Sequence, residues 1–337
     1  MSVRVLRLLA ASLLPTAVSA QSLDLTIDHT GLSIGDSRFV RGVRINFRDR
    51  NLELVQGVNI TVWSPDEPAR GVVQGLALGV PVTGAKRIEG VGVGIFGVGT
   101  TEEFSGIGIG GFGVGSGGDA RGALIGEFGV GSGHNVTGLT IGGFGAGAGG
   151  DVTGIQIGGF GVGAGGRVTG ISIGGFGAGA GGDLKGLTIG GFGAGSGGDI
   201  TGITIGGFGT GAGGDIRGIT IGGFGAGAGG TLEGLVIGGF GAGAPRIRAI
   251  VLTGVGAGGL DVEGGVLAPL YFKIEEGGRV SGITISSFNH VKGDQFGLSL
   301  GLLNYAWNLH GVQIGVLNYA KNNPRGLRLL PIFNKRW

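Results

Sequence analysis

One stretch decides the fold of this chain: GITIGGFGTGAGGDIR, residues 202–217, is a single copy of a sixteen-residue repeat. Ten phenylalanines recur at intervals of sixteen residues, and they are Phe96, Phe112, Phe128, Phe144, Phe160, Phe176, Phe192, Phe208, Phe224 and Phe240. A short fixed period indicates one small structural unit stacked on copies of itself. Each unit then covers the apolar surface of its neighbour.

The apolar pattern within the repeat indicates short strands joined by glycine turns. We number the repeat from its first glycine, so that Gly202 is position 1 and Arg217 is position 16. Apolar side chains occupy positions 2, 4, 7 and 15, glycine pairs occupy positions 5–6 and 12–13, and Asp is commonest at position 14. Steps of two are typical of strands, and glycine permits turns. The pattern predicts strands at positions 2–4 and 7–11, with the Phe ladder inside and position 3 in solvent.

The predicted fold class is therefore an all-β solenoid of about nineteen short coils. The expected divisions are a signal peptide (1–20), an N-terminal cap (21–41), irregular repeat units (42–89), glycine-rich sixteen-residue repeats (90–265) and C-terminal repeat units (266–337). In this frame further units begin at Ile250 and Val266, which places Phe272 at position 7. No cap is evident near Trp337, and an exposed terminal edge leaves end-to-end self-association open.

The main alternative is an outer-membrane antiparallel β-barrel with one strand per repeat. A lipid-facing strand needs about ten residues of unbroken alternation, whereas Gly206-Gly207 interrupts the alternation in this repeat. Three Trp and three Tyr are too few for two aromatic girdles. The solenoid is preferred, and the barrel remains the second interpretation.

Composition indicates an exported chain without disulfides. Arg4 and Arg7 precede the apolar stretch Leu8–Leu14, and Val18-Ser-Ala20 has the small residues of a cleavage site. Of 24 basic residues, two lie in that segment, so 22 remain against 22 acidic ones. A neutral chain without a basic face predicts no nucleic-acid partner. Localisation is expected to be the cell surface, the outer membrane or the extracellular space, and membrane association is left open.

The C-terminal units resemble a known family. GLSLGLLNYA (297–306) and GVQIGVLNYA (311–320) resemble the bacterial surface-repeat proteins with tandem G-V-Q-I-G-x-x-N units, and so do the segments 44–51 and 57–63. The resemblance implies an exported or surface-exposed bacterial repeat protein, and it brings no catalytic residues to this chain. Asn304 and Asn318 are expected to hydrogen-bond along the stack.

No residue set indicates catalysis, a cofactor or a strong metal site. The segment 161–166 fits G-x-G-x-x-G, but the same pattern recurs in most copies and no helix is expected after it, which argues against a nucleotide site. The four histidines, His29, His134, His290 and His310, show no metal-ligand spacing. The cluster Arg44, Arg48, Asp49 and Arg50 is predicted to form a solvated, salt-linked edge.

Two polar ladders are weak candidates for ligand binding. Asp183, Asp199 and Asp215 at position 14 would stack about 4.8 Å apart, where a cation would relieve their repulsion. The simpler interpretation is that each Asp supports its turn. Hydroxyl rows at positions 3 and 16 raise ice binding as another hypothesis.

The functional expectation is a non-catalytic structural or adhesive protein of the surface or extracellular space. Its partner would be a surface macromolecule that the sequence does not identify. The alternatives are an outer-membrane channel and an ice- or cation-binding array.

Overall fold

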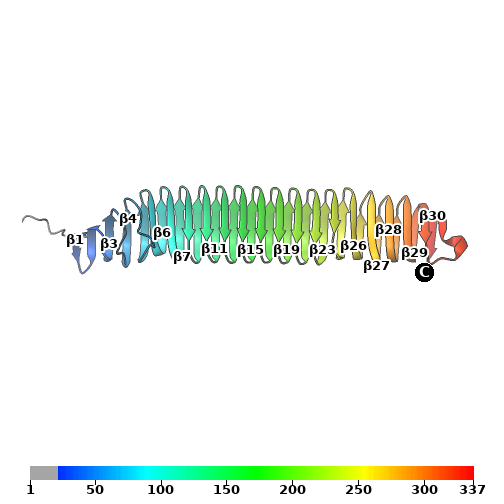
Figure 1. The fold of residues 1–337 in the computed structure, drawn as a ribbon, viewed down its shortest axis with the longest axis horizontal. Helices are drawn as coiled ribbons and strands as arrows, with labels where there is room; N and C mark the ends of the chain where they lie inside the picture. The colour runs from blue at the N-terminus through cyan, green and yellow to red at the C-terminus, as the bar shows by residue number, and fades with distance from the viewer. Residues whose placement is uncertain (1–21) are drawn as a thin grey trace, which may run out of the picture.

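The structure, a computed structural model, describes residues 22–337 and shows a straight rod of stacked β-coils (Figure 1). It has about 17 coils, which confirms the β-solenoid and is close to the expected nineteen. The signal-peptide prediction falls on residues outside the described part of the chain.

Each glycine-rich repeat contributes one long and one short strand. The long strands run from position 15 of one copy to position 5 of the next, with β23 beginning one residue earlier. They are β9 (Ala120–Gly126), β11 (Val136–Gly142), β13 (Val152–Gly158), β15 (Val168–Gly174), β17 (Leu184–Gly190), β19 (Ile200–Gly206), β21 (Ile216–Gly222) and β23 (Thr231–Gly238). The short strands occupy positions 8–11, with β24 ending one residue earlier. They are β8 (Gly113–Ser116), β10 (Gly129–Ser132), β12 (Gly145–Ala148), β14 (Gly161–Ala164), β16 (Gly177–Ala180), β18 (Gly193–Ser196), β20 (Gly209–Ala212), β22 (Gly225–Ala228) and β24 (Gly241–Gly243). Position 7 therefore lies in the turn between the two strands.

The less regular coils flank this block. On the N-terminal side lie β1 (Ser22–Ile27), β2 (Thr30–Gly35), β3 (Phe39–Asn46), β4 (Leu54–Thr61), β5 (Val72–Gly79), β6 (Val82–Gly94) and β7 (Gly97–Gly110). On the C-terminal side lie β25 (Arg246–Thr253), β26 (Gly256–Leu267), β27 (Tyr271–Ile285), β28 (Phe288–Leu300), β29 (Leu303–Ala320), the short 3₁₀ helix η2 (Arg325–Leu327) and β30 (Leu329–Arg336).

The coils stack in parallel and in register. Ile203 of β19 pairs with Ile219 of β21, sixteen residues later, and the short strands pair with their equivalents in the same way. The antiparallel barrel is therefore wrong, because each strand of the repeats lies beside its own copy rather than beside the next strand in the chain. Identical neighbours on both sides explain why one sequence repeat is sufficient to define the whole central block.

Both ends of the rod are closed by antiparallel strands. At one end β1 pairs antiparallel with β2, and at the other β30 folds back on β29, with Phe333 opposite Ile314. The expectation of an uncapped last coil is therefore wrong. Residues after Gly326 do not begin another coil, because they turn through η2 and return along the edge of β29.

The C-terminal units also begin earlier than the sixteen-residue frame predicts. Ala249 pairs with Gly234, and Gly264 pairs with Ala249, so these two units have fifteen residues. Phe272 pairs with Ala257 at position 9, not position 7, and its side chain is fully buried. The prediction that Phe272 continues the Phe ladder is wrong.

The interior is lined by positions 15, 3 and 9, and this reverses the predicted orientation. Ile200 at position 15 is 1% exposed and Thr188 at position 3 is 3% exposed, whereas Phe192 at position 7 is 49% exposed. Ile203 at position 2 is also exposed, at 41%. The prediction that the Phe ladder lies inside and the position-3 hydroxyls lie outside is therefore wrong.

The physical reason is a wedge-shaped interior that narrows toward position 7. A Cβ added to Gly206 at position 5 would lie 2.0 Å from the carbonyl oxygen of Gly209 at position 8, so the two sheets touch there. Farther from this corner the interior widens: positions 3 and 9 mostly hold Thr and Ala and accept an occasional Leu124 or Val162, and position 15 regularly holds Val, Leu or Ile. Large side chains at positions 2, 4 and 7 have no room inside and point outward.

Charge substitutions within one coil test this orientation. Thr188→Asp places an unpaired charge in the interior, and we expect it to lower the free energy of unfolding by about 3–5 kcal/mol. Phe192→Asp removes one ring from an exposed stack, and we expect a loss of about 1 kcal/mol. Chemical denaturation of both variants, compared with the parent protein, measures the difference. A larger loss for Phe192→Asp would contradict the assigned interior.

Candidate interaction surface

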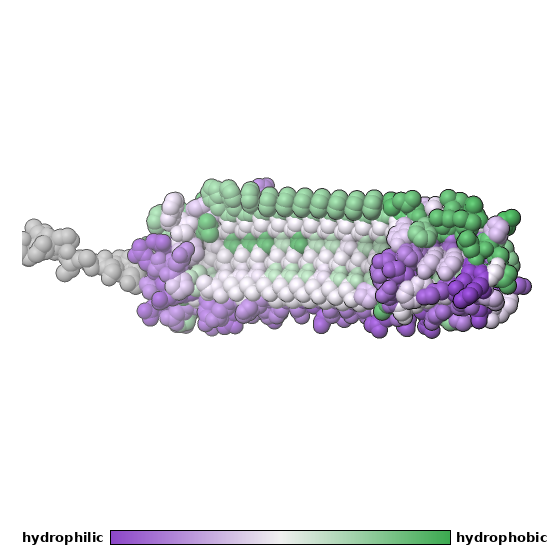
Figure 2. Space-filling view, turned by 45° about the vertical axis from the view of Figure 1, so that its right-hand side comes forward, coloured by the Kyte–Doolittle hydropathy of each residue, from purple (hydrophilic) through white to green (hydrophobic). Residues whose placement is uncertain are grey.

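The most prominent exterior feature is a continuous row of apolar side chains at position 7, which we name the apolar ridge. Its members are Phe47, Trp63, Pro81, Phe96, Phe112, Phe128, Phe144, Phe160, Phe176, Phe192, Phe208, Phe224, Phe240, Val255, Leu270, Ser287, Leu302 and Leu317. Ser287 is its single polar member. With one member per coil and about 4.8 Å per coil, the apolar ridge is about 80 Å long. Figure 2 shows its central part as a green line of rings along one edge of the rod.

The rings of the apolar ridge stack almost in parallel. Between Phe144 and Phe240 neighbouring ring centroids are 4.8–5.0 Å apart, with interplanar angles of 0–4°. The backbone follows the same ladder, since the N–H of Phe208 donates to the carbonyl of Phe192 at 2.6 Å. The rings are held in a fixed row, and about half of each side chain remains exposed.

An aliphatic surface adjoins the apolar ridge on the long-strand side, and we name it the aliphatic flank. It consists of positions 2 and 4, where Ile155 and Ile157 are 38% and 37% exposed. The same rows continue to both ends of the rod, with Ile34 near one end and Ile314 near the other. Exposed apolar areas of this extent on a protein surface mark sites of interaction.

A surface without side chains adjoins the apolar ridge on the short-strand side, and we name it the glycine flank. Every residue at positions 8 and 10 from Gly97 to Gly258 is glycine. Figure 2 shows it as pale rows between the green ridge and the purple edge, with side chains raised at both ends. Pro65 lies over Gly84 at one end, and the rings of Phe288 and His290 stack at the other.

The fold does not require glycine at position 10 in the central repeats, where from Gly147 to Gly243 an added Cβ would meet nothing closer than 3.4 Å. None of the glycines at positions 8 and 10 of the glycine flank has a positive φ, and a Cβ on Gly179 would meet only the Gly195 carbonyl oxygen, at 3.4 Å. By contrast, Gly202 at position 1 has φ of 124° and no space for a Cβ. A glycine inside a strand costs about 0.5–1 kcal/mol relative to Ala. The repeat keeps glycine at these positions although Ala would stabilise the strand, which indicates that the bare surface serves a contact outside the chain.

Charged side chains gather on the opposite edge of the rod, at positions 14 and 16, which we name the polar edge. The carboxylates there support their turns: the N–H of Asp199 donates to Asp183 at 3.1 Å, that of Asp215 to Asp199 at 2.8 Å, and that of Thr231 to Asp215 at 2.7 Å. Arg217 pairs with both Asp199 and Asp215, and Arg167 lies 3.4 Å from Asp183. The backbone and arginine partners of the three weak cation candidates favour the turn interpretation.

These backbone hydrogen bonds lower two carboxyl pKa values. Donation from the N–H of Asp199 holds the pKa of Asp183 below its usual 3.8, and donation from the N–H of Thr231 does the same for Asp215. Both bonds favour the charged form, because they are made to the carboxylate. The folded state therefore binds these protons less readily than the unfolded chain.

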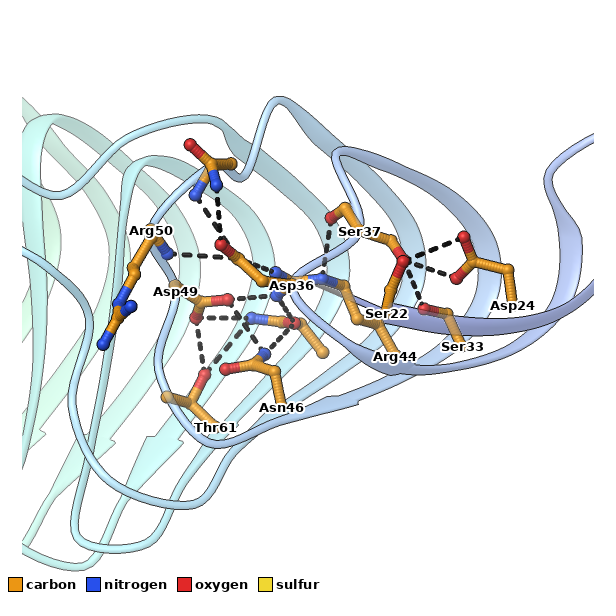
Figure 3. Close-up of polar contacts among 12 residues, drawn as sticks. Ser22, Asp24, Ser33, Asp36, Ser37, Arg44, Asn46, Asp49, Arg50 and Thr61 are labelled. Carbon is orange, nitrogen blue, oxygen red and sulfur yellow. Dashed lines mark hydrogen bonds and ion pairs between the residues drawn. The ribbon is translucent and has the colours of Figure 1, made fainter. Parts of the chain in front are cut away.

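A buried polar network replaces the apolar interior in the first coils (Figure 3). Arg44 at position 3 is fully buried; its guanidinium forms an ion pair with Asp49 and lies 2.8 Å from Asp36 and 2.9 Å from Asn59. Thr61 also donates to Asp49, at 2.6 Å. The prediction of a solvated edge is wrong for Arg44 and Asp49: Arg44 lies inside the rod because β3 shares the register of the next coils, and Asp49 turns inward from the loop after β3 to pair with it.

An asparagine ladder fills the interior of the last coils. Asn289 donates to Asn304 at 2.7 Å, and Asn304 donates to Asn318 at 2.7 Å. Asn318 then donates to the carbonyl of Leu330 in β30 at 3.3 Å, which ties the closing strand to the stack. The predicted hydrogen bonding of Asn304 and Asn318 along the stack is confirmed.

The other candidate residues are not brought together. His290 lies 3.0 Å from the hydroxyl of Tyr271, and burial lowers its pKa, whereas His29, His134 and His310 lie in other coils. Within residues 22–337 no group of three or more His, Cys, Asp or Glu side chains is arranged to hold a metal ion. In the same residues no helix is long and apolar enough to cross a membrane.

Comparisons with known proteins leave the surface to be interpreted from its own geometry. The chain matches no protein-family model, no curated protein and no solved structure.

Acid titration tests the role of the Asp ladder. Because folding lowers the pKa values of Asp183 and Asp215, their contribution to the free energy of unfolding is complete at pH values above the pKa of the unfolded chain. It is lost as the pH falls from about 5 through the folded pKa values. We expect the melting temperature to fall over that range. In the variant Asp183→Asn, Asp199→Asn, Asp215→Asn the fall should be smaller, because Asn does not take up a proton in this range. Its side-chain oxygen still accepts the backbone hydrogen bond, as that of Asn135 does from the N–H of Asp151 at 2.8 Å. An unchanged acid response would refute this assignment.

Proposed function

We propose that this chain is an exported, non-catalytic structural or adhesive protein that attaches along its length through the apolar ridge. The observation that carries the proposal is the unbroken row of half-exposed Phe rings from Phe96 to Phe240 on a straight rod. The resemblance of the units at 297–306 and 311–320 to bacterial surface-repeat proteins supports the same class of function.

Energetics favour an attachment made of many weak contacts. Burying the exposed half of one Phe side chain contributes about 1 kcal/mol. Ten such rings contribute about 10 kcal/mol, which is comparable with the estimated 4–15 kcal/mol cost of association. A single coil falls far short of this cost, whereas the whole array offsets most of it and leaves burial of the flanks to add to binding. The rigid spacing of the rings keeps this contribution available without further ordering on binding.

The alternative functions receive less support. The channel hypothesis rested on the barrel fold, which is wrong. Ice binding loses its best row, because the position-3 hydroxyls such as Thr188 and Thr204 are buried. The exposed Thr row at position 16 is interrupted by Lys185 and Arg217.

Adsorption to a solid apolar surface tests the proposed function. We expect the protein to bind an alkylated sensor surface, and the variant with Ser at Phe160, Phe176, Phe192, Phe208 and Phe224 to bind at least about 1000-fold more weakly, since the five lost rings together remove about 5 kcal/mol. The matched control carries Leu at the same five positions and should retain most of the binding. Equal adsorption of the Ser and Leu variants would refute attachment through the apolar ridge.

A further inference from the structure

We propose that the partner of the apolar ridge is a lipid surface, into which the rod sinks edge-on with the polar edge in water. This inference rests on the proposed function and names its partner. It starts from the cross-section of one coil. The apolar ridge stands between the aliphatic flank and the glycine flank, and the charged positions 14 and 16 lie on the far edge. Figure 2 shows this order from ridge to polar edge on the glycine side.

The apolar ridge is convex, and both of its flanks are uncharged. From Gly138 to Gly243 the outward positions between 2 and 10 carry only Ile, Leu, Val, Phe or glycine. A flat partner, including a second copy of this chain, can cover one flank only. A fluid apolar phase covers the ridge and both flanks at once. The geometry therefore favours lipid over a folded protein partner.

The backbone N–H groups at the apolar ridge are hydrogen-bonded without water, although within residues 22–337 the carbonyl of Gly191 in the same turn accepts no hydrogen bond. In the turn of one coil, the N–H of Gly207 donates to Gly190 at 3.0 Å, and the N–H groups of Phe208 and Gly209 both donate to the carbonyl of Phe192. The strands on either side are paired coil to coil in register. Backbone groups without partners are what exclude irregular chain from hydrocarbon, and this corner has its donors satisfied.

In this arrangement the glycine flank contacts the acyl chains of the lipid. Neither positive φ nor lack of space requires glycine at positions such as Gly179, Gly195 and Gly211. A bare surface lets acyl chains lie against the sheet up to the polar edge. Positions 8 to 11 span about 10 Å at 3.3 Å per residue, which is the depth that interfacial amphipathic helices occupy.

The charges of the polar edge indicate a zwitterionic rather than an anionic surface. Arg217 is surrounded by Asp199, Asp215 and Glu233, and Arg121 by Glu103 and Asp119. Basic side chains that are already paired leave little net attraction for anionic headgroups. Binding should therefore depend on apolar contact and change little with the anionic lipid fraction.

Fluorescence quenching in vesicles tests the orientation. Trp63, Trp307 and Trp337 are first replaced by Phe, so that an introduced Trp is the sole indole emitter. The purified protein is mixed with phosphatidylcholine vesicles that contain lipids brominated on the acyl chains, and two variants report on opposite edges of one copy of the repeat. Phe192→Trp on the apolar ridge should be quenched by the bromines, and Thr201→Trp on the polar edge should not. Equal quenching of both, or of neither, would overturn the proposal.

Co-flotation with phosphatidylcholine vesicles tests the role of the glycine flank. Gly179→Asp, Gly195→Asp and Gly211→Asp together should reduce vesicle binding at least 10-fold, whereas Thr169→Asp and Thr201→Asp on the polar edge should not. Circular dichroism checks that both variants are folded. Unchanged binding of the glycine-flank variant would overturn edge-on insertion.

Two further outcomes separate this inference from the proposed function. Adsorption to the solid apolar surface without vesicle binding overturns the lipid partner and leaves adhesion standing. A concentration-dependent blue shift of the Phe192→Trp emission without vesicles, together with a dimer in sedimentation, overturns it in favour of a second copy. Loss of both adsorption and vesicle binding in the parent protein refutes the proposed function as well.

Discussion

The close approach of the two sheets at position 5 is the constraint on which the rest of the structure depends. Gly206 has no space for a Cβ because the Gly209 carbonyl lies against it. The interior therefore begins with glycine, continues mostly with Thr and Ala at positions 3 and 9, and holds Val, Leu or Ile regularly at position 15. A core this thin cannot bury all the apolar residues of the repeat, so the larger share of them lies outside.

The same constraint arranges the exterior into regions of different chemistry. The narrow corner of the wedge carries the apolar ridge, because a side chain in that turn has no interior to enter. The wide side carries the polar edge, where the Asp ladder and its arginines support the longer turn. Parallel in-register stacking then extends each region along the rod, so that a row of weak contacts becomes a surface. An amphipathic cross-section repeated in this way is suited to attachment along its length.

The sequence predicted the architecture well and the orientation poorly. The sixteen-residue spacing of the Phe residues predicted parallel stacking, and the glycine pairs predicted the turns. The apolar pattern predicts that Ile205 and Phe208 both point into the interior, and both point outward. Burial depends on the distance between the two sheets, which the pattern of one strand does not reveal. The glycines at positions 5 and 8 are the feature of the sequence that indicates a close approach of the two sheets. Arg44 shows the same point, since its equivalence to the buried Asn59 appears only when the coils are aligned.

Thiol labelling in the native state tests the central claim, that positions 7 and 3 lie on opposite sides of the sheet. The chain has no Cys, so a single introduced thiol gives an unambiguous signal. A Phe192→Cys protein should react with a maleimide reagent as fast as a free thiol, and a Thr188→Cys protein should react only as its coil unfolds. Fast labelling of Thr188→Cys with protection of Phe192→Cys would contradict the inverted interior and the surface built on it.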